Sequence, residues 1–424
     1  MRRILGELQR HLMIFGLSNN YVYSSFALIV GVFSSYKDLN LTGINIVDNK
    51  IETLTIVISI FSIIYRFFME TRELRNRGNE FFEIDLPTYK NKVMDSISLS
   101  EKYKKNGYEF DEFNGEKYVM SRVVNRKLYL DRYEPKIQYL GDFILANEVR
   151  QVAPFALNNA FKSKRTIFNS KLIRLADDIC MDRSCNKNSE FIRLQRTDYF
   201  QGLCTNEMVY RRLRKMTTIY DPFIFEGKQL MLDNESNLLS LCKSHCSNYL
   251  GGSTLAVTKD NYIILNRQSD SSHTNPGRIA PSGSGSTDYR DYKRLKENSS
   301  FQDLAILTME RELREECNLR YKNIGMNSRI IGFARLLERG GKPDFFGVTY
   351  MDINHDEIGT SFKESLEIGG YEIISRSFKE YKDIPDELYN VIKENPGRVS
   401  IQIYILAKIL GDLYKDNIDV YGEL

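Results

Sequence analysis

The sequence is poor in the residues on which several common kinds of site depend. Its 424 residues include only 4 histidines, and no Gly-any-Ser-any-Gly segment occurs, so a serine or cysteine hydrolase triad finds little support. Its 6 cysteines are few and unevenly spaced, which favours reduced thiols in a cytosolic body over a disulfide framework. Cys242 and Cys246, with His245 between them, match no standard zinc finger even with Cys180 and Cys185 as partners. Cysteines four residues apart on a helix are commonly core residues, so zinc is not expected here.

A large excess of charge of one sign is also absent. The formal net charge is +3 and 42% of the residues are hydrophobic, which implies neither disorder nor a surface built for nucleic acid. No DNA or RNA polymer is therefore expected as a partner. One basic cluster, Arg211, Arg212, Arg214 and Lys215, could receive phosphates, although a solvated charged face is the simpler interpretation. The length indicates two or three domains.

Charged residues are missing altogether from residues 12–36, a stretch long enough to cross a bilayer. A second apolar run, residues 54–65, is shorter and spans only if Arg66 lies at the interface with its aliphatic stem in the lipid. The link at residues 37–52 holds two lysines and three acidic residues, whereas the flanks outside both runs are rich in arginine. By the positive-inside rule both termini and the main body lie in the cytoplasm, and the link lies outside.

The sequence thus predicts a two-helix transmembrane hairpin with a cytosolic extension over residues 1–82. A cleaved signal peptide is disfavoured, because no small-residue cleavage pattern is evident and a second apolar run follows the first. A buried pair of soluble helices is the alternative that stays open. Residues 83–240 carry no functional motif and are predicted to form a cytosolic α+β linking domain. Within it, residues 117–120 and 191–194 are strand-like, and residues 172–176 are helix-like.

The most informative stretch of the chain is residues 311–319, in a helical-looking run that begins at Phe301. On a helix Glu312, Glu315 and Glu316 share one side, because they are spaced i, i+3 and i+4. Carboxylates this close repel one another, and a hard cation such as Mg²⁺, which takes oxygen ligands, would reverse that penalty. A solvated helix face, with Arg311 paired to Glu315, explains the same residues, so both interpretations stay open at this point.

These nine residues resemble the core of the Nudix box, Arg-Glu-aliphatic-any-Glu-Glu-any-Gly-aliphatic, with Asn318 where the family has Gly. Upstream, residues 251–258 and 262–267 are predicted strands around a turn at residues 259–261. Residues 281–285 look like a relaxed form of the family's Pro-Gly-Gly loop. Residues 329–334 and 344–350 suit the strands that follow, and residues 400–410 are predicted to be a core helix that closes the domain. The resemblance covers roughly residues 241–424 and implies a Nudix-like α/β/α sandwich there.

The resemblance also implies roles for individual residues. Glu312 would be the general base, Arg311 would orient it, and Glu315 with Glu316 would hold Mg²⁺ as a cofactor. The family's earlier Glu is Asp303 here, the Gly before that is Glu297, and the distance from Pro281 to Arg311 is about a dozen residues longer than usual. The altered loop leaves the position of a hydrolysable diphosphate open.

A phosphate-containing ligand would need donors around that loop. The predicted ligand-binding residues are the loop residues Ser282 and Gly283 and the basic residues Arg267, Arg278 and Lys342.

A cytosolic Nudix-like domain behind a two-helix hairpin resembles the membrane effectors of bacterial cyclic-nucleotide antiphage signalling (CBASS). That resemblance rests on architecture. It implies a multi-pass protein of the bacterial inner membrane that binds a cyclic oligonucleotide and assembles as a homo-oligomer to disrupt the lipid bilayer. The competing hypothesis is a membrane-anchored, Mg²⁺-dependent Nudix hydrolase of compounds linked to nucleoside diphosphates. A third is a scaffold that keeps the fold with neither activity.

Overall fold

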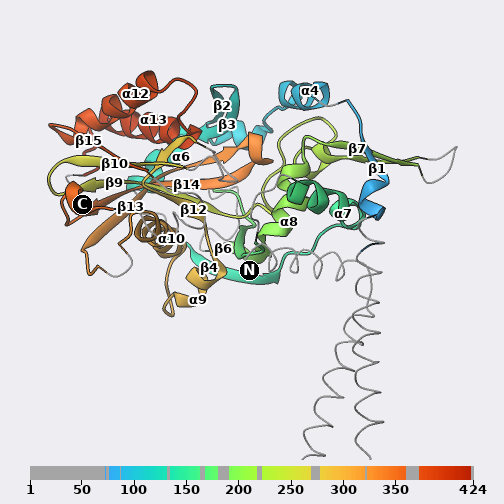
Figure 1. Cartoon of the computed structure of the whole chain (residues 1–424), viewed down its shortest axis with the longest axis horizontal. Helices are drawn as coiled ribbons and strands as arrows, with labels where there is room; N and C mark the ends of the chain where they lie inside the picture. Colours follow the sequence, from blue (N-terminus) through green and yellow to red (C-terminus); the bar gives the residue numbers. More distant parts are fainter. Residues whose placement is uncertain are drawn as a thin grey trace, which may run out of the picture. The chain divides into compact units, whose positions relative to one another are not determined.

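The computed structural model describes residues 72, 76–85, 87–130, 134–162, 168–179, 191–216, 222–268, 277–319, 322–359 and 372–421 (Figure 1). The chain divides into two compact units. The smaller unit draws on Met1–Ile84, Ala146–Asn169 and Arg212–Phe225, and the larger on Asp85–Leu145, Ser170–Arg211 and Glu226–Leu424. Both apolar runs of the predicted hairpin, residues 12–36 and 54–65, lie outside the described residues. Within the described ranges no helix is long and apolar enough to cross a membrane.

The larger unit is built on a nine-stranded sheet. Its strand order is β11-β10-β9-β14-β13-β3-β2, with β12 paired to β9 and β15 paired to β10. β9 and β14 run parallel, whereas the other pairs that involve these strands are antiparallel. The strands are β2 (Tyr108–Phe113), β3 (Glu116–Ser121), β9 (Gly251–Thr258), β10 (Tyr262–Arg267), β11 (Ile279–Pro281), β12 (Gly283–Ser286), β13 (Met326–Leu336), β14 (Lys342–Met351) and β15 (Glu372–Ser377). β9 and β10 have the bounds that the sequence predicts.

Helices cover both faces of this sheet (Figure 1). Leu255 and Val257 of β9 share one core cluster with Leu406 and Leu410, whereas Ala256 between them joins Leu313 in another. Alternate residues of a strand point to opposite faces, and every residue of β9 is buried, so both faces of the strand are covered. Leu313 belongs to α10 (Phe301–Glu316). Leu406 and Leu410 belong to α13 (Ile401–Lys415), and residues of α12 (Ile384–Glu394) join the same cluster. The expected α/β/α layering and the core helix near the C-terminus are confirmed.

The middle of the sequence contributes to this same sheet. β3 pairs with β13 through Met120 and Ala334, which adds the β2–β3 hairpin to the edge of the nine strands. A second sheet of the larger unit has the order β4-β6-β5. Its strands are β4 (Lys136–Asp142), β5 (Lys171–Leu175) and β6 (Phe191–Asp198).

The helix expected at residues 172–176 is wrong, because this segment forms β5. β5 pairs antiparallel with β6 from Lys171 opposite Asp198 to Leu175 opposite Leu194. Its residues after Lys171 are buried, so packing on both faces of the strand overrides the local helix preference of leucine and alanine. The strands expected at residues 117–120 and 191–194 are present as β3 and β6.

The remaining elements are short or peripheral. The helices are α4 (Thr88–Ser96), α5 (Glu101–Lys105), α6 (Arg122–Leu130), α8 (Tyr199–Cys204) and α9 (Tyr289–Arg294), with short 3₁₀ turns at Asn206–Met208, Gly227–Leu230, Leu337–Arg339, His355–Glu357 and Tyr381–Asp383. The smaller unit contains α7 (Asn147–Lys162) and a three-stranded sheet of β1 (Phe81–Glu83), β7 (Arg212–Met216) and β8 (Pro222–Glu226) in the order β1-β7-β8. The helical extension expected up to residue 82 therefore ends earlier, because β1 is a strand that pairs with β7.

Candidate functional site

The helix α10, which carries the box residues, begins with a capping box. The Ser300 hydroxyl accepts a hydrogen bond from the Asp303 backbone N–H at 3.2 Å, and the Asp303 carboxylate accepts from the Ser300 N–H at 2.6 Å. Each side chain satisfies a backbone donor that the first helical turn would otherwise leave open. Asp303 stands where the Nudix family has its earlier Glu, and here its carboxylate serves the helix start.

The end of α10 explains the other departure from the family pattern. Asn318 has a φ of +55°, and the Leu319 N–H donates to the Arg314 carbonyl at 2.8 Å. This is the left-handed turn with which many helices end, a position that favours Gly and tolerates Asn. Asn318 therefore stands at a helix end whose backbone conformation a glycine would also adopt.

Arg311 is the centre of the cluster on this helix. Its Nε donates to both carboxylate oxygens of Asp291, at 3.0 and 2.9 Å. Its Nη1 lies 2.9 Å from Glu312 Oε1 and 3.5 Å from Glu315 Oε2, and its Nη2 donates to the Ser286 carbonyl at 3.0 Å. Arg311 thus contacts Glu312 directly, which its predicted role of orienting that residue requires. Its guanidinium joins three carboxylates.

Asp291 is the residue of this cluster that sequence reasoning missed. It lies on α9, within the extra length between Pro281 and Arg311, and its side chain is fully buried. Asp288, which caps α9, also contributes its N–H to the Asp291 carboxylate at 3.2 Å. The extra loop length was visible in the sequence, but nothing in it indicated that one of its acids would reach Arg311.

Burial dominates the electrostatics of the cluster. Burial raises the pKa of Glu312 above its usual range, although the Arg311 charge opposes this, and Glu315 adds to the rise. Burial likewise raises the pKa of Asp291 in spite of its bidentate bond to Arg311. Burial lowers the pKa of Arg311, but the charges of Glu312 and Asp291 outweigh it and raise this pKa above the ordinary value. The cluster therefore holds a permanently charged arginine beside Glu312 and Asp291, whose carboxyls bind protons more tightly than usual.

Glu316 lies apart from this cluster, against the sheet. Its Oε2 accepts from Asn266 Nδ2 at 2.9 Å and from the Ser284 N–H at 3.3 Å, and its side chain is buried. Asn266 also donates to the Ser282 carbonyl at 2.8 Å, so β10, β12 and the end of α10 are joined through one amide. The Ser282 hydroxyl is itself used inside the fold, since it accepts from the Ala256 N–H at 2.6 Å.

The glycines of the loop allow β12 to approach α10 closely. A Cβ on Gly283 would lie 2.7 Å from the Leu313 backbone nitrogen, and a Cβ on Gly285 would lie 2.0 Å from Glu312 Oε1. At Gly283 the neighbour is helix backbone, so glycine is a packing requirement of that contact. At Gly285 the neighbour is the end of the Glu312 side chain, which would have to move. The relaxed Pro-Gly-Gly loop keeps a glycine opposite the predicted general base.

The arrangement of these side chains does not fit the predicted magnesium site. Glu312 and Glu315 contact Arg311, whereas Glu316 accepts a hydrogen bond from Asn266. Across the described ranges no group of three or more His, Cys, Asp or Glu is placed to hold a metal ion. In this arrangement Arg311 supplies the positive charge that Glu312, Glu315 and Asp291 share.

Each of the predicted basic ligand residues is engaged with an acid. Arg267 Nε lies 3.0 Å from Glu372 Oε2, Arg278 donates to Glu116, and Lys342 donates to Asp344. Arg267 and Arg278 lie together, because the Gln268 N–H next to Arg267 donates to the Arg278 carbonyl at 2.9 Å. Lys342 is only 2% exposed, and burial lowers its pKa to about 8 in spite of Asp344. As placed, this lysine is part of the interior.

Four of the cysteines fall within the described residues, and all four are free: Cys204, Cys242, Cys246 and Cys317. Cys242 is exposed and Cys246 is buried. Cys180 and Cys185 lie outside the described residues.

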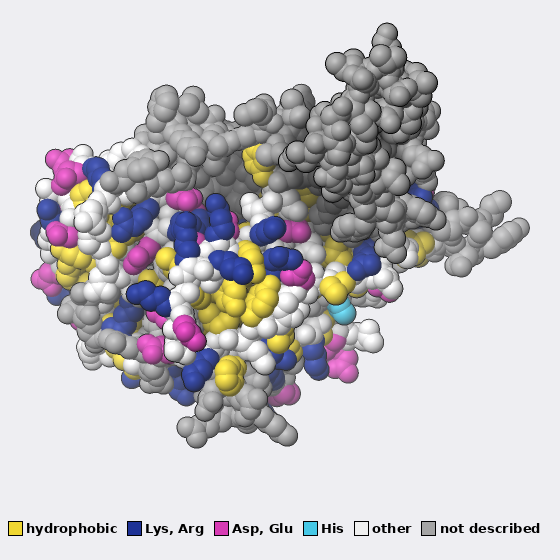
Figure 2. Space-filling view, turned by 90° about the horizontal axis from the view of Figure 1, so that it is seen from below, with side chains coloured by type: hydrophobic (Ala, Val, Ile, Leu, Met, Phe, Trp, Pro, Cys, Tyr) yellow, Lys and Arg dark blue, Asp and Glu magenta, His cyan; other side chains and the backbone are white. Residues whose placement is uncertain are grey.

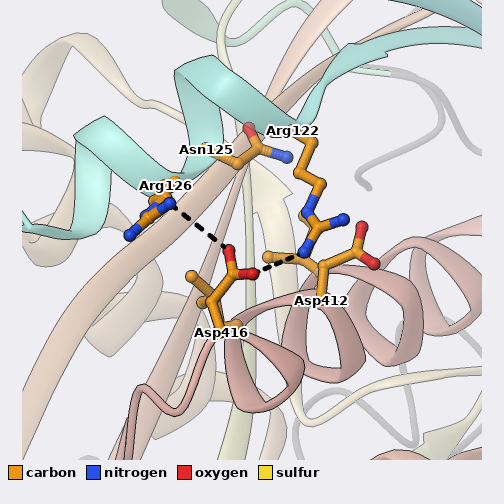
Figure 3. A pocket seen from close by; sticks show the side chains of 7 residues that line it. Arg122, Asn125, Arg126, Asp412 and Asp416 are labelled. Carbon is orange, nitrogen blue, oxygen red and sulfur yellow. Dashed lines mark hydrogen bonds and ion pairs between the residues drawn. The ribbon is translucent and has the colours of Figure 1, made fainter.

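A polar hollow lies between α6 and α13 (Figure 3). Arg122 Nη2 donates to Asp416 Oδ1 at 2.6 Å, and Arg126 Nη1 lies 3.9 Å from the other Asp416 oxygen. Asp412 also lines the hollow, so two arginines are balanced by two aspartates. Asn125 Nδ2 has no hydrogen-bond partner among the described residues. The charge balance makes this hollow a weaker candidate for a phosphate ligand than its arginines alone would suggest.

The surface seen in Figure 2 carries lysine and arginine side chains interspersed with aspartate and glutamate around a patch of hydrophobic side chains. No continuous basic stripe crosses this view.

Comparisons with known proteins place the chain only loosely. No protein-family model matches the sequence, and no curated protein matches it. Solved structures that resemble it include the following three. DR0079 from Deinococcus radiodurans is 14% identical, with a TM-score of 0.25 and coverage of 38% of this chain and 82% of that one. Tm1382, described as a candidate Nudix hydrolase, is 10% identical, with a TM-score of 0.27 and coverage of 60% and 96%. The MutT protein from Methanosarcina mazei is 15% identical, with a TM-score of 0.23 and coverage of 40% and 96%. At these TM-scores, conclusions about function have to come from the geometry of this chain.

Proposed function

We propose that this chain is a membrane-attached receptor whose Nudix-like domain binds a cyclic oligonucleotide, and that binding drives assembly of the N-terminal helices to disrupt the bilayer. This is the role of a CBASS effector in a bacterial inner membrane, with both termini in the cytoplasm. The observation that carries the proposal is the internal pairing of the box carboxylates. Arg311 holds Glu312 and Glu315, and Asn266 holds Glu316.

The internal pairing of the box carboxylates bears on function because a receptor and a hydrolase require different arrangements of the side chains on α10. A hydrolase of this family type would need its carboxylates directed to a metal and to an attacking water. A receptor needs a rigid, shaped site whose affinity differs between two states of the protein, because a ligand shifts an equilibrium only by that difference. Fixed carboxylates that already have protein partners favour the second role.

The competing function is a membrane-anchored hydrolase, and one observation favours it. Glu312 is directed by Arg311 from the preceding position of α10, and its side chain is still 15% exposed. A carboxyl whose pKa is raised by burial can act as a general base closer to neutral pH than an ordinary glutamate. A receptor would bind the nucleotide and leave it intact, whereas a hydrolase would cleave its substrate with Mg²⁺. The fate of the ligand therefore distinguishes the two functions.

The test is calorimetry of the purified full-length chain in detergent against a panel of cyclic di- and trinucleotides, with the ligand analysed by chromatography afterwards. We expect at least one member of the panel to bind, with or without Mg²⁺, and to be recovered intact. Absence of binding across the panel, together with Mg²⁺-dependent cleavage of linear dinucleoside polyphosphates, would assign the chain to the hydrolases.

A double variant provides a second measurement. Glu315→Gln with Glu316→Gln keeps the shape of both side chains and removes two negative charges, which a hard cation requires. We expect cells that express this variant to lose membrane integrity as fast as the parent when the cyclic nucleotide is supplied. Loss of this toxicity together with loss of a measured hydrolysis would contradict the receptor.

A further inference from the structure

The three-stranded sheet of the smaller unit has two different faces. On one face Phe81 of β1 contacts Phe155 of α7 and Phe223 of β8, with ring centroids 6.4 and 6.2 Å apart. Lys215, which lies opposite Phe81 in the register, places its ammonium 5.7 Å from the Phe81 ring centre. This face is the hydrophobic interior of the unit, and α7 covers it (Figure 1).

The other face carries large apolar side chains in the open. Successive residues of a strand alternate between faces, so Phe82 points away from α7, and so does Ile224, which follows the inward Phe223. Phe82 is 62% exposed and Ile224 is 45% exposed. Arg214 lies directly opposite Phe82 in the β1–β7 register and is also exposed. We call Phe82, Arg214 and Ile224 the outer face of this sheet.

The strands of the outer face carry charges of both signs. Arg212 alternates onto the same side as Arg214, and Glu226, on the same side as Ile224, has Lys228 Nζ at 3.7 Å. Aromatic and aliphatic side chains beside arginines suit the boundary of a bilayer, where rings enter the acyl region and guanidiniums bind phosphates. Arginine side chains near anionic lipid are attracted electrostatically to its phosphates.

The position of β1 in the sequence bears on what covers the outer face. β1 begins at Phe81, shortly after the basic residues Arg66, Arg72, Arg75 and Arg77 that follow the second apolar run of the sequence. If residues 54–65 cross the bilayer, the sheet starts within a short length of chain from its cytoplasmic surface. We propose that the outer face lies on the lipid bilayer, with Phe82 and Ile224 at the headgroup–acyl boundary and Arg214 on anionic phosphates. The inference rests on the membrane attachment proposed above and not on the identity of the nucleotide.

The absence of tryptophan from the sequence makes this proposal directly testable. Phe82→Trp places a single fluorophore on the outer face of the full-length chain. The chain is reconstituted into vesicles of phosphatidylcholine and phosphatidylglycerol whose acyl chains are brominated near the headgroup. We expect the emission to fall to about half or less of its value in unbrominated vesicles, because the ring sits at the depth of the bromines. Ile224→Trp repeats the measurement from another strand if the first variant folds poorly.

The matched control is Phe110→Trp, which replaces an exposed phenylalanine of β2 in the larger unit. Its emission should be the same in both kinds of vesicle. Equal quenching of both fluorophores would overturn the proposal, and so would a blue-shifted Phe82→Trp emission that bromine does not quench, because protein would then cover the face. Flotation on a density gradient distinguishes failure of the docking face from failure of the membrane attachment. A chain that floats without quenching at position 82 loses only the docking face, whereas a chain that does not float loses the membrane attachment as well.

Discussion

At the scale of single residues, this protein places several charges in its interior and pairs each with a specific partner. Arg311 is surrounded by Asp291, Glu312 and Glu315, and Lys342 is paired with Asp344. A buried pair gains little over an apolar replacement, but removal of one partner leaves a charge without compensation. The side chains of Arg311, Asp291, Glu312 and Glu315 therefore depend on one another, and a change in any one of them alters the protonation of the others.

The raised pKa of Glu312 leads to a prediction about stability and pH. In the unfolded chain a glutamate has a pKa of about 4.3. Because burial raises this pKa in the folded state, the folded chain holds the proton more tightly, and ionisation of Glu312 costs stability as the pH rises above that range. Glu312→Gln should therefore unfold at a higher temperature than the parent at pH 7, by a few degrees, and the difference should disappear near pH 4.

Thermal unfolding followed by circular dichroism from pH 4 to pH 7 measures this difference. Glu297→Gln, in the exposed loop before α10, is the control and should match the parent at every pH. A Glu312→Gln variant that is less stable than the parent at pH 7 would mean that the ion pair with Arg311 outweighs the cost of burial.

At the scale of elements, the box helix is defined by its two ends. Ser300 and Asp303 form the capping box at the start, and Asn318 turns the chain in the left-handed conformation at the end. Between these ends, the loop glycines Gly283 and Gly285 bring β12 against α10 without a side chain between them. The caps and the glycines together fix the position of Arg311 and Glu312 relative to the sheet.

Asn318 provides the prediction at this scale. Asn318→Gly should leave the free energy of unfolding within about 0.5 kcal/mol of the parent, because glycine adopts positive φ without strain. Asn318→Val should lower it by about 1–2 kcal/mol, since a β-branched residue is strained in that conformation. Urea denaturation measures both. Equal stability of the two variants would show that the turn after α10 can change its conformation freely.

At the scale of the whole molecule, the proposed function depends on residues that lie outside the described ranges. In the sequence Ala27, Gly31 and Ser35 recur at steps of four, and small residues spaced in this way let helices approach closely in lipid. Ser59 and Ser62 belong to a polar stripe on the second apolar run. Polar groups exposed to hydrocarbon are costly, so this stripe should face another helix or water.

The hairpin prediction follows from these stripes. Gly31→Leu should block close approach of the helices, and Ser59→Leu with Ser62→Leu should remove the polar stripe, while both changes keep the segments apolar enough to insert. We expect dye entry into cells after induction of the cyclic nucleotide to slow at least several-fold in each variant. Membrane fractionation confirms insertion. Variants that insert and admit dye as fast as the parent would reduce the hairpin to a tether.

Local sequence pattern determined much of the framework. Residues 251–258 and 262–267 are strands with the predicted bounds, and the box helix begins at Phe301 as its pattern indicates. These features are readable because each depends on the spacing of apolar residues and on turn residues a few positions away. The place of Arg311 beside Glu312 was implied by the Nudix resemblance for the same reason, since both residues lie on one helix.

Only the tertiary structure decided which charged groups meet. Asp291 reaches Arg311 from an inserted helix, and Arg278 and Lys342 meet Glu116 and Asp344 through the pairing and alternation of strands. β5 became a strand because β6 offered a partner, although its own residues favour a helix. Such contacts join positions far apart in the chain or depend on strand register, and neither composition nor periodicity within one segment encodes them. The sequence alone thus determined where the carboxylates stand on α10, and the fold determined what each of them touches.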